Sequence, residues 1–192
     1  MPKSYWMVVQ TLENFRISRE RGFDVHGFRL RYRRRAERME CDDPVLFYIS
    51  ELRKWAAIAT VTSRYFEDTK PIWKTNRKND SFPYRVNLSL SMLLKEEDYV
   101  DGLILGPRLE YVKRWPPERW PLAFHDSLHI LPQRDFRLIE AEMKRVRSKP
   151  MRRRRGGTSR REGRRDERRS NVSGEAPSPD GDLGDAADVL VE

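Results

Sequence analysis

The 192-residue chain is basic, with 39 Lys+Arg against 30 Asp+Glu and a formal net charge of +9. Its single cysteine, Cys41, excludes an intramolecular disulfide and a cysteine-based zinc cluster. No stretch approaches the roughly 18 apolar residues of a membrane span, and the apolar run at residues 5–9 is too short for a signal peptide.

These exclusions predict a cytoplasmic protein without a membrane partner. The basic charge suits a polyanion, with nucleic acid the first candidate, although charge of this size also serves solubility alone.

The first part of the chain alternates strand and helix signals. Residues 5–11, YWMVVQT, are aromatic and β-branched, which is typical of a buried strand. The strand end at Thr11 leads into a short helix that we expect to stop at Gly22. Residues 28–40 begin with apolar–basic alternation and then become a run of charge, which favours a loop or an edge segment.

The clearest strands lie in the middle of the chain. They are residues 43–50, DPVLFYIS, and residues 55–67, WAAIATVTSRYFE. Both are apolar, and a short polar turn joins them. A polar loop at 69–82 follows. In residues 84–91 apolar and polar side chains alternate, which predicts a half-buried strand.

The last part of the body is less regular. Acidic residues precede apolar ones in 95–104, as in a short helix that Gly102 closes. Residues 107–124 are too rich in proline for regular structure, and we expect their tryptophans to pack this segment onto the body. A short strand at 127–133 and an amphipathic helix at 133–148 complete the predicted elements.

The composition changes after Pro150. Residues 148–192 lack hydrophobic periodicity and predict a disordered tail, arginine-rich at 152–169 and then acidic. The arginines of this tail would bind phosphate without sequence preference and hold nucleic acid near the body; the first four are Arg152, Arg153, Arg154 and Arg155. The body, residues 1–147, is one domain.

The order of segments in the body resembles the EVE domain, a branch of the PUA-like fold related to the YTH readers of methylated adenine. The motifs that carry the resemblance run from residue 5 to residue 143: YWMVVQTLENF, HGF, DDPVLFYIS, AAIATVTSRYFED, PIW, FPYRV, LEYVKRW and QRDFRLIEAEM. The chain departs from the usual pattern at Phe15, where tryptophan is common, at the turn Asp42-Asp43-Pro44, and in the basic run 31–38.

The resemblance implies an α+β fold that is mostly β, with a curled antiparallel sheet or small barrel and short peripheral helices. It also implies a nucleic-acid-binding, non-enzymatic module that captures one nucleobase, expected to be a modified one, in an aromatic pocket. The base, and whether DNA or RNA carries it, stay open.

A pocket of this kind needs flat walls for stacking, polar groups for the base edge and basic residues at its mouth. The predicted base-binding residues are Trp6, Asn14, Tyr48, Ser50, Tyr65 and Trp73, and Arg85 is predicted at the pocket rim or on phosphate. Each has a structural alternative: the rings in apolar strands could be core, Asn14 could cap a helix, and Arg85 could pair with a neighbouring carboxylate.

Two other functions stay open. One is a basic RNA- or DNA-binding domain without a base pocket. The other is an amidohydrolase similar to the related ASCH domains, for which the strand pair offers Lys54, Thr60, Thr62 and Glu67. His125 and His129 have no evident third ligand, and no nucleophile or phosphate-loop motif is present, so we expect neither a metal nor another cofactor.

Overall fold

The computed structural model describes residues 3–75 and 80–148. Contacts divide the chain into Met1–Met151 and Arg152–Glu192. The predicted tail from residue 149 onward, with its arginines Arg152 to Arg155, lies outside the described residues.

The described residues form eight strands, four α-helices and five short 3₁₀ helices. In chain order these are β1 (Tyr5–Gln10), α1 (Leu12–Glu20), β2 (Val25–Phe28), η1 (Leu30–Tyr32), α2 (Arg33–Ala36), β3 (Pro44–Ile49), β4 (Lys54–Val61), β5 (Phe66–Glu67), β6 (Tyr84–Leu93), η2 (Glu96–Asp98), β7 (Val100–Asp101), α3 (Gly102–Leu105), η3 (Gly106–Arg108), η4 (Tyr111–Arg114), η5 (Trp120–Phe124), β8 (Leu128–Leu131) and α4 (Gln133–Ser148).

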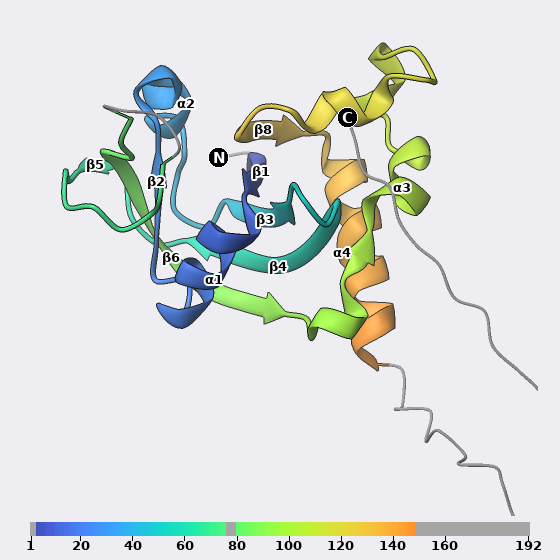
Figure 1. The fold of residues 1–192 in the computed structure, drawn as a ribbon, viewed down its shortest axis with the longest axis horizontal. Coiled ribbons are helices and arrows are strands. Elements are labelled where there is room, and N and C mark those ends of the chain that lie inside the picture. The colour runs from blue at the N-terminus through green and yellow to red at the C-terminus, as the bar shows by residue number, and fades with distance from the viewer. Residues whose placement is uncertain (1–2, 76–79, 149–192) are drawn as a thin grey trace, which may run out of the picture. The chain divides into compact units, whose positions relative to one another are not determined.

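The strands form one curled mixed sheet in the order β2-β6-β4-β3-β1-β8, with β5 added to β6 and β7 to β4. Figure 1 shows the strands curving past one another, with α1 near β1 and α4 beside the other end of β4. Only β1 and β3 pair in parallel; all other pairs are antiparallel. The predicted PUA-like fold class is therefore confirmed, with one parallel pair, β1 with β3, among the described strands.

Most predicted elements are present, and the cap signals explain their ends. The side chain of Thr11 accepts a hydrogen bond from the amide of Asn14 and so caps α1. Gly22 follows α1 with φ +68°, the left-handed conformation in which glycine ends helices. No helix among residues 3–75 and 80–148 is long and apolar enough to cross a membrane.

Several local predictions are wrong. The segment 107–124, predicted to lack regular structure, contains the 3₁₀ helices η4 and η5. The segment 28–40 contains η1 and α2 instead of a loop, because a helical turn places Tyr32 and Ala36, four residues apart, on one buried face. Gly102 begins α3 instead of ending a helix. A Cβ there would lie 2.6 Å from the Arg53 carbonyl oxygen and 3.0 Å from the Tyr48 ring, so only glycine fits.

The Asp43 side chain, directly before β3, ties together the start of β1 and the backbone at Glu40. It is 3% exposed, and its carboxylate accepts hydrogen bonds from the Trp6 indole (2.9 Å), the Ser4 amide (2.9 Å) and the Glu40 amide (3.1 Å). Hydrogen bonds to a charged acceptor are stronger than neutral ones, and buried donors that lose their acceptor carry a desolvation penalty. The carboxylate therefore anchors the core ring of Trp6.

Replacing this carboxylate should destabilise the protein. For Asp43→Ala we expect the free energy of unfolding to fall by about 3 kcal/mol, because three donors lose their partner at a buried site. Urea unfolding of the full chain measures this. Glu97→Ala, at an exposed position, is the matched control and should change the value by less than about 0.5 kcal/mol. Equal, small effects for both variants would contradict the anchoring role.

Candidate functional site

A cavity of about 300 Å³ opens where β1, β2 and the loop after β5 meet. We call it the pocket. Its lining consists of Val9, Gln10, Thr11, Asn14, His26, Gly27, Phe28, Arg29, Tyr32, Ser50, Trp73, Phe82, Phe124, His125 and Ser127. Five of these carry phenyl, phenol or indole rings, so the cavity offers flat apolar surface with polar groups between.

Trp73 and Phe82 pack directly onto the backbone of Gly27. A Cβ on Gly27 would lie 2.5 Å from the Trp73 ring and 2.9 Å from the Phe82 Cβ, so a side chain at this position would push both rings away. The two rings meet edge to face with centroids 5.7 Å apart. The Trp73 indole donates a hydrogen bond of 3.0 Å to the Ser18 hydroxyl on α1. Glycine in β2 thus allows a loop to supply aromatic surface to the pocket.

Gln10, at the end of β1, carries an unpaired polar atom. The residue is 6% exposed, and its Nε2 donates to the Ser18 Oγ at 3.0 Å and lies 3.4 Å from the His26 Nδ1. Its Oε1 has no hydrogen-bond partner among the described residues. A buried, unpaired amide oxygen costs about 1–3 kcal/mol. A ligand that donates a hydrogen bond to this amide would offset that cost.

His26 adds a neutral imidazole to the pocket. Burial lowers the pKa of His26 from 6.5 to about 3, so the ring is uncharged near neutral pH. Because the Gln10 Nε2 can only donate, the His26 Nδ1 accepts and the proton resides on Nε2. The ring packs edge to face on Trp73, with centroids 5.4 Å apart. The inner part of the pocket is therefore polar but without charge.

The structure brings three of the six predicted base-binding residues to this pocket, namely Asn14, Ser50 and Trp73. The other three lie elsewhere. Trp6 is fully buried in the core, held by Asp43. Tyr48 is 5% exposed and packs on Trp55 and Phe124, where burial raises its pKa to about 12. Tyr65 packs on Tyr84, away from the pocket lining.

These three placements correct the prediction that the Trp6, Tyr48 and Tyr65 rings line one pocket. Trp6 and Tyr48 point into the tightly packed interior because β1 and β3 are central strands whose both faces are covered. Tyr65 directly precedes β5, and its ring packs on Tyr84 of β6, so it does not line the pocket.

Asn14 lines the pocket, but its side-chain amide is already paired. Its Nδ2 donates to the Lys74 carbonyl and its Oδ1 accepts from the Lys74 amide, both at 2.9 Å. Asn14 therefore clamps the backbone beside Trp73 onto α1. The Ser50 hydroxyl lies 3.2 Å from the Gln10 carbonyl and 2.7 Å from the Glu51 carboxylate. Both residues hold the pocket in shape more than they face its interior.

Arg85 supports the pocket from behind. Its side chain is 3% exposed, its guanidinium pairs with Asp68 and the Lys70 carbonyl, and its Nε donates to the Phe82 carbonyl at 3.2 Å. The guanidinium carbon lies 5.7 Å from the centre of the Trp73 ring. The predicted contact of Arg85 with phosphate does not fit this burial. The alternative, pairing with a neighbouring carboxylate, is what the Asp68 contact shows.

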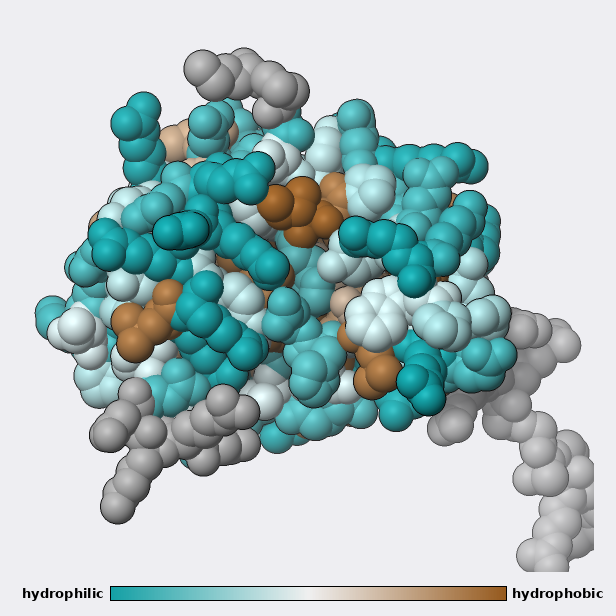
Figure 2. Space-filling model, turned by 90° about the horizontal axis from the view of Figure 1, so that it is seen from above, coloured by the Kyte–Doolittle hydropathy of each residue, from teal (hydrophilic) through white to brown (hydrophobic). Residues whose placement is uncertain are grey.

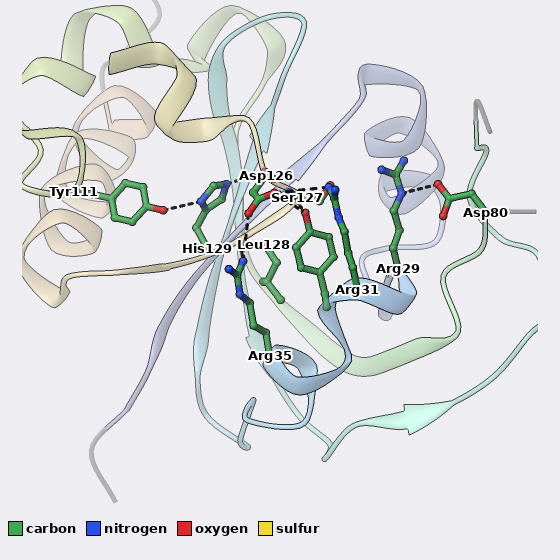
Figure 3. A network of polar contacts seen from close by, with 10 residues as sticks. Arg29, Arg31, Arg35, Asp80, Tyr111, Asp126, Ser127, Leu128 and His129 are labelled. Carbon is green, nitrogen blue, oxygen red and sulfur yellow. Dashed lines mark hydrogen bonds and ion pairs between the residues drawn. The ribbon is translucent and has the colours of Figure 1, made fainter. Parts of the chain in front are cut away.

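Basic side chains lie near the pocket, and Figure 3 shows those around Asp126, a residue that does not itself line the pocket. Arg31 and Arg35 lie 3.7 and 3.5 Å from the Asp126 carboxylate, which also accepts a 3.0 Å hydrogen bond from the Tyr32 hydroxyl. Arg29 lies 2.9 Å from Asp80 and 5.5 Å from the centre of the Phe82 ring. The run 31–38 therefore supplies charge beside the pocket, and Arg29 supplies it in the lining.

His129 completes this network. Its Nε2 donates to the Asp126 carbonyl at 2.7 Å, which leaves Nδ1 to accept from the Tyr111 hydroxyl at 2.8 Å. Burial lowers the pKa of His129. Both ring nitrogens are thus engaged in hydrogen bonds, and no group of three or more potential metal ligands occurs among the described residues.

The residues considered for an amidohydrolase are not assembled. Lys54 and Thr60 lie six residues apart on β4, about 20 Å at a rise of about 3.3 Å per residue. Glu67, on β5, pairs with Arg33. None of Lys54, Thr60, Thr62 and Glu67 lines the pocket.

Sequence reasoning missed Gln10, Gly27, His26 and Phe82 as pocket residues. Three of them lie in the HGF and FPYRV motifs, so a close reading of those motifs could have found them. Gln10 carries a weaker signal: it is a polar residue that ends an otherwise apolar strand, directly before the helix cap.

No family model and no curated protein matches the sequence. Among solved structures, the chain is similar to the YTH domain of Zygosaccharomyces rouxii MRB1 in complex with N6-methyladenosine RNA, with 13% identity, a TM-score of 0.54, and 74% of this chain and 87% of that chain covered. It is also similar to the YTH domain-containing protein mmi1 in an RNA complex (12% identity, TM-score 0.52, 75% and 86% covered). A further structure of the MmI1 YTH domain gives 10% identity and a TM-score of 0.54, with 77% and 100% covered.

The burial of His26 makes stability pH-dependent in a defined direction. Because its pKa is about 3 in the folded state and 6.5 otherwise, the unfolded chain takes up a proton between these values and the folded chain does not. Stability is therefore full above pH 6.5 and falls as the pH decreases towards 3. Between pH 7 and pH 5 the contribution of His26 is a loss of about 2 kcal/mol.

We expect His26→Gln to reduce the loss of unfolding free energy between pH 7 and pH 5 by about 2 kcal/mol relative to the parent chain. Urea unfolding at the two pH values measures the difference. The same substitution at the exposed His125 controls for removal of an imidazole. An unchanged pH dependence in His26→Gln would show that the His26 imidazole is protonated in the folded protein.

The sequence identities to the three YTH structures are far below the level that would transfer a function. The three structures nevertheless agree with this chain in architecture over most of each chain. The curled sheet and its peripheral helices are those of the YTH domains, within the PUA-like fold to which the sequence motifs pointed.

Proposed function

We propose that this protein is a nucleic-acid-binding module that captures a single nucleobase in the pocket. The observation that carries the proposal is the unpaired Gln10 amide oxygen inside a cavity walled by Trp73 and Phe82, where the arginine of the lining, Arg29, is paired with Asp80. A base has flat faces for the rings and N–H groups for the amide. A phosphate or a carboxylate would find only Arg29 in the described lining, and that guanidinium is already paired with Asp80.

The size and electrostatics of the site support a base as ligand. A volume of about 300 Å³ is at the lower end of the range for small-molecule sites, about 300–1,000 Å³, so a single base fits better than a stacked pair. Stacking on aromatic side chains contributes about 1–3 kcal/mol per base. Arg29 and Arg31 at the mouth are placed for the sugar-phosphate backbone, which would lie outside.

The fold adds to this argument. One of the YTH domains with this architecture is described as a complex with N6-methyladenosine RNA. A modified base is favoured here because an enclosed apolar wall can hold an added methyl group, at about 0.8 kcal/mol per buried methylene-sized group. DNA and RNA are both possible carriers.

The module is proposed to bind without catalysis. The residues of the amidohydrolase alternative lie apart, and both ring nitrogens of His129 are engaged in hydrogen bonds. The arginines of the tail, Arg152 to Arg155, are proposed to hold nucleic acid near the pocket by phosphate contacts, and the protein is proposed to be cytoplasmic.

The first test is a binding titration of the full chain with short single- and double-stranded DNA and RNA. Each strand carries cytosine, 5-methylcytosine, 5-hydroxymethylcytosine, adenine or N6-methyladenine at one position. We expect a preference of tenfold or more, about 1.4 kcal/mol, for one base. Equal, salt-sensitive binding to every strand would instead identify a general basic binder without a base pocket.

Two variants test the assignment of the pocket. Phe82→Ala removes a half-buried wall and should weaken the preferred ligand about tenfold. Gln10→Met keeps the length of the side chain but removes the amide, and should reduce the preference among bases. Gln133→Met, at the exposed start of α4, is the matched control. If both pocket variants fold, by their unfolding transitions, and bind like the parent chain, the pocket is not the base site.

A further inference from the structure

A second concavity of about 750 Å³ lies beside the pocket. We call it the groove. The residues that matter here are Arg35, Tyr111, Arg114, Trp115, His125 and Asp126. The groove is larger and more open than the pocket, and nothing in the capture of a single base requires it.

The groove and the pocket are neighbours built from the same two segments. Both are lined by His125. The segment η1–α2 contributes Tyr32 to the pocket and Arg35 to the groove, and residues 122–129 border both cavities. In Figure 3 Arg35 and Tyr111 lie on one side of Asp126, and Arg29 with Asp80 on the other. A ligand that leaves the pocket past His125 therefore reaches the groove first.

The groove carries more positive charge than the pocket, where Arg29 is paired with Asp80. Arg114 lies over the Tyr111 ring, 5.2 Å from its centre, and has no ion pair among the described residues. Arg35 is about half exposed and donates to the Leu128 carbonyl at 2.7 Å. The only carboxylate in the groove lining, Asp126, is shared by Arg31 and Arg35. The balance suits a phosphate group.

The groove also offers an exposed indole. Trp115 is 39% exposed, whereas Trp6, Trp55 and Trp73 are buried. Its ring has no hydrogen bond or ring contact among the described residues. The prediction that both tryptophans of 107–124 pack onto the body holds for Trp120, which lies against Gly106, but not for Trp115. An exposed indole next to a basic side chain is a stacking platform for a base.

The upper side of the molecule in Figure 1, with α2 and β8, is the face seen in Figure 2. This face is mainly hydrophilic, with a few separate hydrophobic spots. A broad apolar surface, as in a stable protein–protein interface, is not what this view presents. The mixture of charge and isolated rings favours a polar strand with flat bases as the occupant.

We propose that the groove binds the nucleotide next to the captured base, with that second base stacked on Trp115 and its phosphate on Arg114. The proposal rests on the proposed function, because it places the first base in the pocket. The bound strand is single-stranded, since a neighbour paired and stacked in a duplex could not turn its face to Trp115. The protein then reads one base and holds its neighbour without reading it.

The test compares ligands of increasing length on the full chain. The probes are N6-methyladenosine, the two RNA dinucleotides that add a uridine on its 5′ or its 3′ side, and the trinucleotide with both; a second series uses 5-methyldeoxycytidine with thymidines. We expect one of the two dinucleotides, but not the other, to bind about tenfold more tightly than the nucleoside, because only one neighbour faces the groove.

Variants of the groove should remove this gain. Trp115→Ala should bring the favoured dinucleotide back to the affinity of the nucleoside, while nucleoside binding is unchanged. Arg114→Gln removes only a charge, and should lower the dependence of log affinity on log salt by about 0.7 for a single strand. Ile104→Ala and Arg108→Ala, at exposed positions outside the groove, are the matched controls and should leave every affinity unchanged.

The outcomes separate the two proposals. If a nucleoside binds but Trp115→Ala and Arg114→Gln bind the longer probes like the parent chain, the groove proposal is wrong and the pocket stands. If no nucleoside binds, yet the trinucleotides bind and both variants weaken them, the groove binds nucleic acid and the pocket assignment fails. If neither nucleosides nor trinucleotides bind, both proposals are overturned.

Discussion

The approach of the Trp73 indole to the backbone of Gly27 is the contact on which the site depends. It brings a loop from the far side of β5 against the edge strand β2, at a distance that no side chain on residue 27 would permit. The contact is held from three directions. Ser18 accepts the indole hydrogen bond, Asn14 pairs with the backbone of Lys74, and the Arg85 guanidinium lies against the ring. Without these contacts the Trp73 ring would be held only by the loop that carries it.

The site contains buried polar and charged groups whose desolvation costs stability. Arg85 is a buried cation, and burial lowers its pKa even though Asp68 opposes that effect. Gln10 and His26 are buried polar groups with incomplete hydrogen bonding. A protein that needed only a stable core would fill this volume with aliphatic side chains. The retained polar groups are therefore best understood as parts of a site that is completed by a ligand.

Charge is distributed to match. The pocket interior is neutral near pH 7, because the His26 imidazole is uncharged there and the Gln10 amide does not ionise. The cations gather outside it, on η1–α2 and in the groove. A nucleotide has the same division of charge, with an uncharged base and a charged phosphate backbone. The neutral interior therefore suits the base, and the cations outside suit the backbone. Binding energy from the backbone then need not distinguish one sequence from another.

Local signals in the sequence determined much of the fold. Alternation in β6, the apolar runs of β1, β3 and β4 and the stop at Gly22 each depend on neighbours a few residues away, and the sequence alone was enough to predict them. The cap of α1 is Thr11, whereas the sequence suggested Asn14 for that role. The choice of rings for the pocket was not local. Tyr48 and Trp73 are both aromatic residues beside apolar ones, yet one packs on Phe124 and Gly102 while the other faces the pocket. That difference arises from the curl of the sheet and from contacts across dozens of residues, such as Trp73 with Ser18. The same long-range packing left Gln10 unpaired, which no pattern along the chain could indicate.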